Sequence, residues 1–182
     1  MRKKPNTIKV HDKKFRKIIS ARKVQQAIEV VAKKINKDFK NKKPIFISVL
    51  NGSFLFTADL IKKVTIECEI SFIKISSYSG TQSTGNMNTL IGLKEDLKGR
   101  NVVVLEEMVD SGNTIEKVIG ELKKLNPESL KIATLFFKPE AYKKNIKLDY
   151  IGMDVPNDFL VGYGLDYDGL GRNLQDIYAA VL

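Results

Sequence analysis

Apolar residues in the first third of the chain recur with two different spacings. Downstream of Ser20 they follow intervals of three and four, at Val24, Ala27, Ile28, Val31 and Ile35. This spacing predicts an amphipathic helix, and Ser20 is placed to cap its first turn. The next run, from Pro44 to Leu50, is short, continuous and rich in branched residues. Such a run is typical of a strand that is buried on both faces of a sheet.

A turn and a second helix are expected after this strand. Asn51 and Gly52 form a turn signal, and the segment from Ser53 to Lys63 lacks the two-residue alternation of a hairpin strand. The next apolar segments, Cys68 to Ile75 and Thr89 to Leu93, are separated by the small and polar stretch SSYSGTQSTGNMN. A connection of this length and composition is typical of either a disordered segment or a functional lid.

The alternation of strands and helices continues along the second half of the chain. Val102 to Leu105 is a strong apolar run, and an acidic segment that contains glycine connects it to a helical pattern from Ile115 to Leu125. We expect further strands at Leu130 to Phe137 and at Tyr150 to Val155. Strands that alternate with helices predict an α/β fold with a mainly parallel, twisted sheet that helices cover on both faces.

Composition limits the class of protein. The 182 residues, 43% of them hydrophobic, fit a single domain over residues 1–182 that buries its own core. The one cysteine, Cys68, excludes an internal disulfide and is expected to be a small buried hydrophobe. No apolar run approaches the ~18 residues that span a bilayer, so we expect a cytoplasmic protein with no membrane partner.

The charge of the chain favours anionic ligands. Lysine and arginine outnumber aspartate and glutamate by 31 to 21, which raises the local concentration of nucleic acids and of phosphorylated small molecules alike. The basic residues lack interleaved aromatic residues, which argues against nucleic acid as a partner. The only histidine, His11, lies in the basic N-terminal segment, and neither GxxxxGK[ST] nor GxGxxG occurs. A P-loop, a dinucleotide fold and a histidine-dependent or zinc enzyme are therefore not indicated.

Candidate phosphate chemistry follows the strand at Val102 to Leu105. Ser111 to Thr114 stand at the start of the next helix, where free N–H groups, hydroxyls and the helix dipole together can hold a phosphate. Gly112 would let the backbone approach that phosphate closely. The alternative interpretation is that Ser111 or Thr114 only caps the helix.

An acidic cluster is not explained by helix capping. Glu106, Glu107 and Asp110 lie at the end of a strand that should be buried, where carboxylates are costly unless they are paired, hydrogen-bonded or bound to a cation. Acids beside a phosphate site suggest a substrate that has both hydroxyl and phosphate groups and carries Mg²⁺.

The segment VVVLEEMVDSGNT, from Val102 to Thr114, resembles the phosphoribosyl-diphosphate motif of the type I phosphoribosyltransferases. That motif is a strand that runs into two acids, two apolar residues and D-[ST]-G-x-T. LNGSFLFTADL, SSYSGTQSTGN, LFFKPE and NDFLVGYGLDYDGLGRN also occur in the order found in the hypoxanthine-guanine branch of this family. The resemblance covers most of residues 8 to 178. It implies a parallel sheet flanked by helices, with a small hood formed by the terminal segments.

For the phosphoribosyl donor, the resemblance implies a full set of contacts. The ribose hydroxyls would be held by Glu106 and Glu107, directly or through Mg²⁺. The site for the ribose and 5'-phosphate comprises these two acids with Asp110, Ser111, Gly112, Asn113 and Thr114. Pyrophosphate would bind Arg172 and the backbone of Asn51 and Gly52, a turn that contains a non-proline cis peptide in some members.

Two positions in the donor site depart from the pattern of the family. Most relatives have Glu-Asp where this chain has Glu106-Glu107, and many have a lysine in place of Asn51. The additional methylene of Glu107 keeps the charge but moves the carboxylate by about a bond length or more.

For the purine, the resemblance implies contacts in the C-terminal half of the chain. Lys138 would donate to the 6-oxo group and so reject the amino group of adenine, although taken alone it reads as a solvated lysine. Phe159 would stack on the base, with a core aromatic as the competing interpretation. The backbone of Leu160 would read the edge of the base, and Asp166 would make a further Mg²⁺ contact. Asp110 would be the general base or acid near purine N7.

The resemblance also implies a mobile lid and an activity. Ser77 and Tyr78 would lie on the lid that closes over the reacting groups. The implied activity is Mg²⁺-dependent transfer of the 5-phosphoribosyl group from 5-phosphoribosyl 1-diphosphate to N9 of hypoxanthine or guanine, in purine salvage. The alternatives are a nucleic-acid-binding regulator with the same fold and an enzyme that prefers xanthine. Members of the family usually form dimers or tetramers, so we expect a homodimer or a homotetramer.

Overall fold

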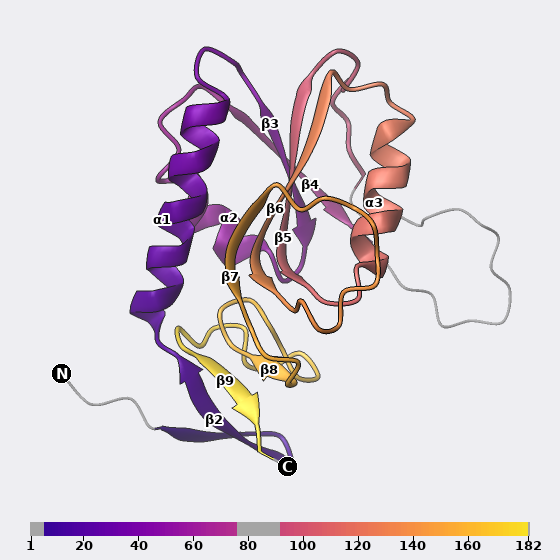
Figure 1. Cartoon of the computed structure of the whole chain (residues 1–182). Helices are drawn as coiled ribbons and strands as arrows, with labels where there is room; N and C mark the ends of the chain where they lie inside the picture. Colours follow the sequence, from indigo (N-terminus) through magenta and orange to yellow (C-terminus); the bar gives the residue numbers. More distant parts are fainter. Residues whose placement is uncertain (1–5, 76–91, 182) are drawn as a thin grey trace, which may run out of the picture.

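The body of the protein is a parallel sheet. The computed structural model describes residues 6–75 and 92–181, and the lid residues Ser77 and Tyr78 lie outside them (Figure 1). In the described part, five parallel strands pair in the order β4-β3-β5-β6-β7. Their bounds are β3 Ile45–Leu50, β4 Glu69–Lys74, β5 Asn101–Val109, β6 Ser129–Phe137 and β7 Tyr150–Asp154. This arrangement confirms the predicted fold class.

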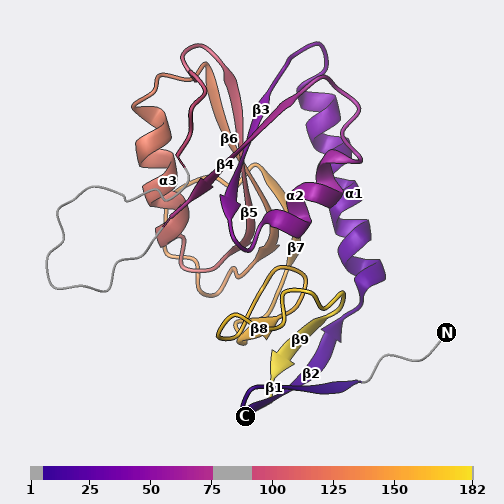
Figure 2. The same ribbon diagram turned by 180° about the vertical axis from the view of Figure 1, so that it is seen from behind.

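Helices cover both faces of this sheet. Helices α1 (Ala21–Asp38) and α2 (Phe54–Ile61) lie on one face and α3 (Asn113–Lys123) on the other (Figures 1 and 2). Successive residues of β5 face opposite helical layers: Val103 packs with α1 and α2, and Val104 packs with α3. A strand that is buried on both sides needs apolar residues at consecutive positions, which is why β5 begins as an unbroken apolar run.

The starts of the helices show one confirmed and one wrong expectation. Ser20 caps α1, since its side chain accepts a hydrogen bond from the backbone N–H of Lys23. Helix α3 is different, because its N-cap is Gly112, which has a left-handed φ of 87° and makes no side-chain capping bond. The interpretation that Ser111 or Thr114 caps α3 is therefore wrong.

A small hood stands beyond the carboxyl ends of the parallel strands. It is an antiparallel sheet in the order β1-β2-β9-β8, formed by β1 Thr7–Val10, β2 Lys13–Ile19, β8 Leu160–Val161 and β9 Ile177–Ala180. Its strands come from both ends of the chain, as the resemblance implies, and Figure 2 shows it beside the start of α1. The hood places the loop between β8 and β9 over the end of the sheet where ligands of α/β proteins collect.

Two smaller findings complete the fold. Cys68 is only partly buried, at the margin of the core that α1 and α2 form with the sheet, so the expectation of a small buried hydrophobe is met only in part. Within the described residues, no helix combines the length and the apolar character that a membrane crossing requires.

Candidate active site

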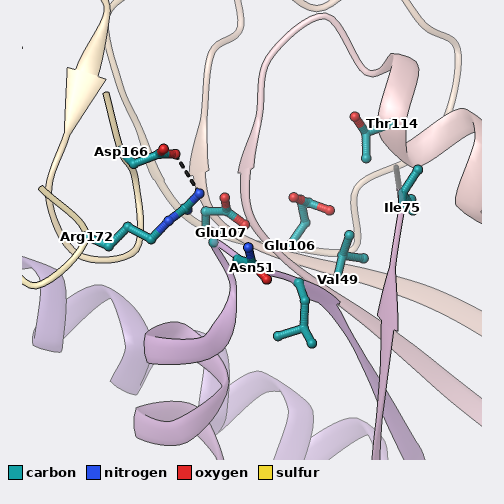
Figure 3. Close-up of a pocket in the computed structure, with 10 residues that line it drawn as sticks. Val49, Asn51, Ile75, Glu106, Glu107, Thr114, Asp166 and Arg172 are labelled. Atoms are coloured by element: carbon teal, nitrogen blue, oxygen red, sulfur yellow. Dashed lines mark ion pairs between the residues drawn. The ribbon is translucent and has the colours of Figure 1, made fainter. Parts of the chain in front are cut away.

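A cavity of about 240 Å³ lies between the end of the parallel sheet and the hood loop. Figure 3 shows its side chains converging from four separate segments of the chain. The lining residues are Val49, Leu50, Asn51, Gly52, Ile75, Glu106, Glu107, Thr114, Asp166 and Arg172. The structure therefore brings the predicted ribose and pyrophosphate contacts to one place, together with Thr114 of the predicted phosphate contacts.

Glu106 and Glu107 are buried more deeply than the sequence indicated. Strand β5 continues to Val109, so both carboxylates project from inside the strand and not from the loop that follows it. Glu106 is 7% exposed, and the Oε2 atom of each carboxylate is buried without a hydrogen-bond partner in the described structure. Oxygen atoms in that state carry a free-energy cost that a cation or a ligand hydroxyl would remove.

Burial also changes the protonation of this pair. Burial and the neighbouring Glu107 carboxylate raise the pKa of Glu106 well above its usual range, and burial raises the pKa of Glu107. The two carboxyl groups lie close enough for each to affect the pKa of the other. A buried pair of like charges is stabilised by a proton or by a bound cation.

The turn after β3 packs directly against this pair. The Leu50–Asn51 peptide bond is cis. A Cβ atom on Gly52 would overlap the carboxylate of Glu107, so a larger residue at that position would displace this side chain. The longer side chain that distinguishes this chain from most relatives thus lies against the turn predicted to bind pyrophosphate.

A second, smaller cavity of about 80 Å³ leads from Glu106 to the start of α3, and residues 108–115 line the rest of it. Two features of this position require glycine. Gly112 has a φ of 87°, and an added Cβ atom would lie 2.6 Å from the ring of Tyr142. The N–H groups in the first turn of a helix have no partner within the helix. Since no side chain caps α3, this helix start is suited to an anion.

On the other side of β5, Lys138 and Asp110 form an ion pair. Strands β5 and β6 run parallel and in register, so the residues that follow them, Asp110 and Lys138, are neighbours. Lys138 Nζ donates to Asp110 Oδ2 at 3.1 Å. Lys138 is 5% exposed, so the interpretation of a solvated lysine is wrong. The two predicted purine contacts hold each other in position.

The remaining predicted residues lie in the hood and its loop. Phe159 is 49% exposed and contacts the ring of Tyr167 edge-on, which excludes the interpretation of a core aromatic. Leu160 is buried in β8, opposite Ala179 of β9. The backbone next to Phe159 is therefore fixed, because Leu160 belongs to a strand that pairs with β9.

Asp166 and Arg172 form an ion pair across the hood loop. Arg172 Nη2 lies 2.7 Å from Asp166 Oδ1, and the Nη1 atom of Arg172 donates to the carbonyl oxygen of Gly164 at 2.6 Å (Figure 3). Within residues 6–75 and 92–181, no three acidic, histidine or cysteine side chains approach closely enough to hold a metal by themselves. A cation here would need ligand oxygens in addition to the carboxylates.

Sequence reasoning missed the residues that hold the hood loop in place. Tyr163 bonds to Asp59 of α2, and a Cβ atom on Gly164 would collide with the carbonyl oxygen of Gly52. The signal available in the sequence was the Gly-Tyr-Gly run at 162–164, because glycines on both sides of a tyrosine are typical of a backbone that adopts left-handed conformations.

Comparison with known proteins agrees with this geometry. The family model for the phosphoribosyl transferase domain matches residues 16–168. The hypoxanthine phosphoribosyltransferase of Buchnera aphidicola subsp. Schizaphis graminum is 44% identical over 153 residues, which cover 82% of this chain and 86% of that protein. The hypoxanthine-guanine phosphoribosyltransferase of Mycobacterium tuberculosis is 37% identical over 167 residues, 88% of this chain and 83% of that protein.

Solved structures show the same relationship. A hypoxanthine-guanine phosphoribosyltransferase from Bacillus anthracis superposes with a TM-score of 0.82 at 34% identity, covering 91% of this chain and 96% of that one. A ternary substrates complex of hypoxanthine phosphoribosyltransferase from Trypanosoma cruzi superposes with a TM-score of 0.83 at 32% identity, covering 91% and 94%. The chain belongs to the phosphoribosyltransferase family. Within that family, its relatives assign it to the hypoxanthine-guanine branch.

Proposed function

We propose that the protein transfers the 5-phosphoribosyl group from 5-phosphoribosyl 1-diphosphate to N9 of hypoxanthine or guanine. The bond from the sugar carbon to the diphosphate breaks, the bond to N9 forms, and pyrophosphate and a nucleoside monophosphate leave. The observation that carries this proposal is one continuous site. It joins an uncapped helix start, a buried carboxylate pair and the Lys138–Asp110 ion pair on adjacent strands of one sheet.

The donor has a distinct place for each of its groups. The 5'-phosphate binds the residues from Ser111 to Thr114 at the start of α3, because free N–H groups and the helix dipole attract an anion there. The ribose hydroxyls face Glu106 and Glu107 in the cavity. The diphosphate lies between the Asn51–Gly52 turn and Arg172, whose planar guanidinium suits two phosphate oxygens.

The carboxylate pair fits a divalent cation of the Mg²⁺ type. Each carboxylate presents one buried oxygen without a partner, and hard oxygen ligands are those that Mg²⁺ prefers. Glu106, Glu107 and Asp166 line the same cavity and would hold such ions together with donor oxygens. When bound, Mg²⁺ neutralises the negative charge of the diphosphate, which makes pyrophosphate a better leaving group.

The acceptor side supplies a proton acceptor and a hydrogen-bond donor that selects bases with a 6-oxo group. Asp110 accepts the proton that the purine loses as N9 bonds to the sugar carbon, and its pairing with Lys138 holds it in place. Lys138 has three N–H donors and can keep its bond to Asp110 while it donates to the 6-oxo oxygen. Adenine presents a donor at that position, so two donors would face each other.

The hood completes the base site. The exposed ring of Phe159 offers a stacking surface, and Phe15 and Tyr167 pack against it from inside the hood. The backbone of Leu160 reads the edge of the base beside this ring.

A turnover assay tests the proposed function. Purified protein is incubated with donor and Mg²⁺, and separately with hypoxanthine, guanine, xanthine and adenine, while nucleotide and pyrophosphate are quantified. We expect turnover with hypoxanthine or guanine and none above background with adenine. Replacing Lys138 by methionine, which keeps the length of the side chain, should reduce the preference for 6-oxopurines. The absence of nucleotide from every 6-oxopurine would overturn the proposal.

We also propose that the protein forms a homodimer or a homotetramer. Ile70 and Phe72 are 40% and 38% exposed and lie on the same face of β4, which is at the edge of the parallel sheet. Exposed apolar side chains beside a sheet edge favour a contact with another subunit. Light scattering on the purified protein measures the assembly, and a monomer at all concentrations would contradict this proposal.

A further inference from the structure

Tyr163 has an unusual backbone conformation for a non-glycine residue. It lies in the loop between β8 and β9, with a φ of 47° and 6% exposure. A side chain in the left-handed region is disfavoured, and such residues persist only where surrounding contacts hold them. The same loop carries Asp166 and Arg172, the two residues that this part of the hood contributes to the cavity.

The contacts that hold Tyr163 come from the body of the protein. Its hydroxyl donates to Asp59 Oδ2 at 2.5 Å, and Asp59 lies on α2. The same carboxylate accepts a hydrogen bond from Gln25 Nε2 on α1 at 2.7 Å and pairs with Lys62 Nζ at 2.6 Å. A hydrogen bond from a buried phenol to a charged acceptor is among the stronger kinds in proteins. The hood loop is thus fastened to both helices of one layer.

The residue after Tyr163 meets the turn predicted to bind pyrophosphate. Gly164 packs so closely on the carbonyl oxygen of Gly52 that no side chain fits there. Its own backbone bonds to Arg172 in both directions, since its N–H donates to the Arg172 carbonyl oxygen and its carbonyl accepts from the guanidinium. One residue away from the phenol, therefore, the loop touches the turn and fixes the arginine.

Helix α2 connects these two walls of the cavity. It begins at Phe54, two residues after Gly52, and it carries Asp59. A shift of α2 would move the turn directly, and it would move the loop through the phenol. The bond between Tyr163 and Asp59 therefore fixes the width of the gap between the turn and Arg172.

We propose that Tyr163, Asp59 and Gln25 form an anchor that positions Arg172 and Asp166 against the Asn51–Gly52 turn for binding of the donor diphosphate. The inference rests on the proposed function for the nature of the ligand. The anchor residues are positioning residues, because neither Tyr163 nor Asp59 is among the residues that line the described cavity. Removing the anchor weakens diphosphate binding and leaves the proton-transfer group, Asp110, in place.

The chain offers a matched control for the phenol. Tyr150 at the start of β7 is 2% exposed, and its hydroxyl donates to Asp38 Oδ2, at the end of α1, at 2.9 Å. This pair has the same chemistry as the anchor, but it lies at the amino end of the parallel strands and away from the cavity. Loss of either hydroxyl leaves a carboxylate without one partner, so similar losses of stability are expected.

The test compares Tyr163→Phe with Tyr150→Phe. Affinity for magnesium pyrophosphate is measured by calorimetry, and steady-state kinetics are measured with donor and with hypoxanthine varied separately. For Tyr163→Phe we expect pyrophosphate affinity to fall and the KM for donor to rise by about 5- to 50-fold. The KM for hypoxanthine and the pH profile of kcat should stay near those of the wild type. For Tyr150→Phe we expect a lower Tm and unchanged pyrophosphate affinity.

Two further arms keep the outcomes distinct. Asp59→Asn keeps the shape of the acceptor and removes its charge, so we expect a smaller loss of pyrophosphate affinity than for Tyr163→Phe. This variant tests the anchor if Tyr163→Phe folds poorly. Equal pyrophosphate affinity in wild type, Tyr163→Phe and Asp59→Asn would overturn the anchor. If the wild type turned over no 6-oxopurine, the proposed function would fail while the calorimetric comparison still tested the anchor. A wild type that binds no pyrophosphate would overturn the anchor together with the donor assignment.

Discussion

The donor side and the acceptor side of the cavity differ in how their carboxylate charges are balanced. On the donor side, Glu106 and Glu107 are buried together, keep an oxygen atom each without a partner and have raised pKa values. On the acceptor side, Asp110 already has a cationic partner in Lys138. A like-charge pair needs a cation or a proton to be stable when buried, whereas an ion pair is balanced by itself.

This difference indicates which side depends on a ligand for its completion. The acceptor side is organised for the base before the base arrives. The donor side is costly until a proton or a bound cation balances the charge of its two carboxylates. Substitutions on the two sides should therefore have different signatures in catalysis, in donor binding and in stability.

The largest effect is expected on the acceptor side, from Asp110→Asn. The amide cannot accept the proton that the purine loses, so kcat should fall by about 10²- to 10⁴-fold. Donor affinity should change less than kcat, because Glu106 and Glu107 are untouched. Steady-state kinetics and calorimetry with magnesium and donor measure the two quantities. A kcat within tenfold of the wild type would show that Asp110 is not the group that accepts the purine proton.

A smaller loss is expected on the donor side from Glu106→Gln. Removal of one charged contact to the cation and the sugar should weaken binding of donor with Mg²⁺ by about 10- to 100-fold. Glu128→Gln is the matched control, since Glu128 bonds to Asn101 at the other end of β5. If both variants bound the donor equally well, the carboxylate pair would have no role in donor binding.

The packing of Glu107 on Gly52 predicts a compensating pair of substitutions. Gly52→Ala should weaken pyrophosphate binding by about tenfold, because the new methyl group displaces the Glu107 carboxylate or the turn. Adding Glu107→Asp shortens the displaced side chain and should restore part of the affinity. Calorimetry on the two single variants and the double variant measures this coupling, and strictly additive effects would contradict the contact.

The smallest effect is expected in the stability of the ligand-free protein. The pKa of Glu106 in the folded state lies above its ordinary value of 4.5. The stability contributed by the protonated form is therefore fully present below that pH and is lost as the pH rises through the folded-state pKa. Glu106→Gln avoids this loss, so its Tm should exceed that of the wild type by about 3 °C at neutral pH.

Calorimetric melting across pH checks this prediction. The difference in Tm between Glu106→Gln and the wild type should vanish near pH 4.5 and grow as the pH rises. A difference that is the same at every pH would show that burial of the charge is not its cause.

The layers of the fold could be predicted from the sequence because they depend on local spacing. The helix after Ser20 and the strand at β3 follow directly from apolar periodicity and from the cap. The family motif likewise predicted residues that the structure brings together in two adjoining cavities, which share Glu106 and Thr114. These features are encoded in neighbouring residues of the chain.

The rest depends on contacts between distant residues or on backbone angles. The carboxylates of Glu106 and Glu107 lie inside β5 because the strand continues to Val109, which apolar spacing does not predict for acidic residues. Gly112 stands at the N-cap of α3, where a capping side chain was expected. The positive φ of this position and the ring of Tyr142 that packs against it both require glycine. Tyr163 and Asp59 are 104 positions apart, and no periodic pattern relates them.

A structure of the protein with Mn²⁺, a non-reactive donor analogue and hypoxanthine tests the central claim most directly, since anomalous scattering locates the cation. We predict a Mn²⁺ ion beside Glu106 and Glu107, in contact with oxygens of the sugar or the diphosphate. We also predict that the base stacks on Phe159 with its 6-oxo oxygen at Lys138. A cation bound away from this pair, or a base bound away from Lys138, would contradict the account.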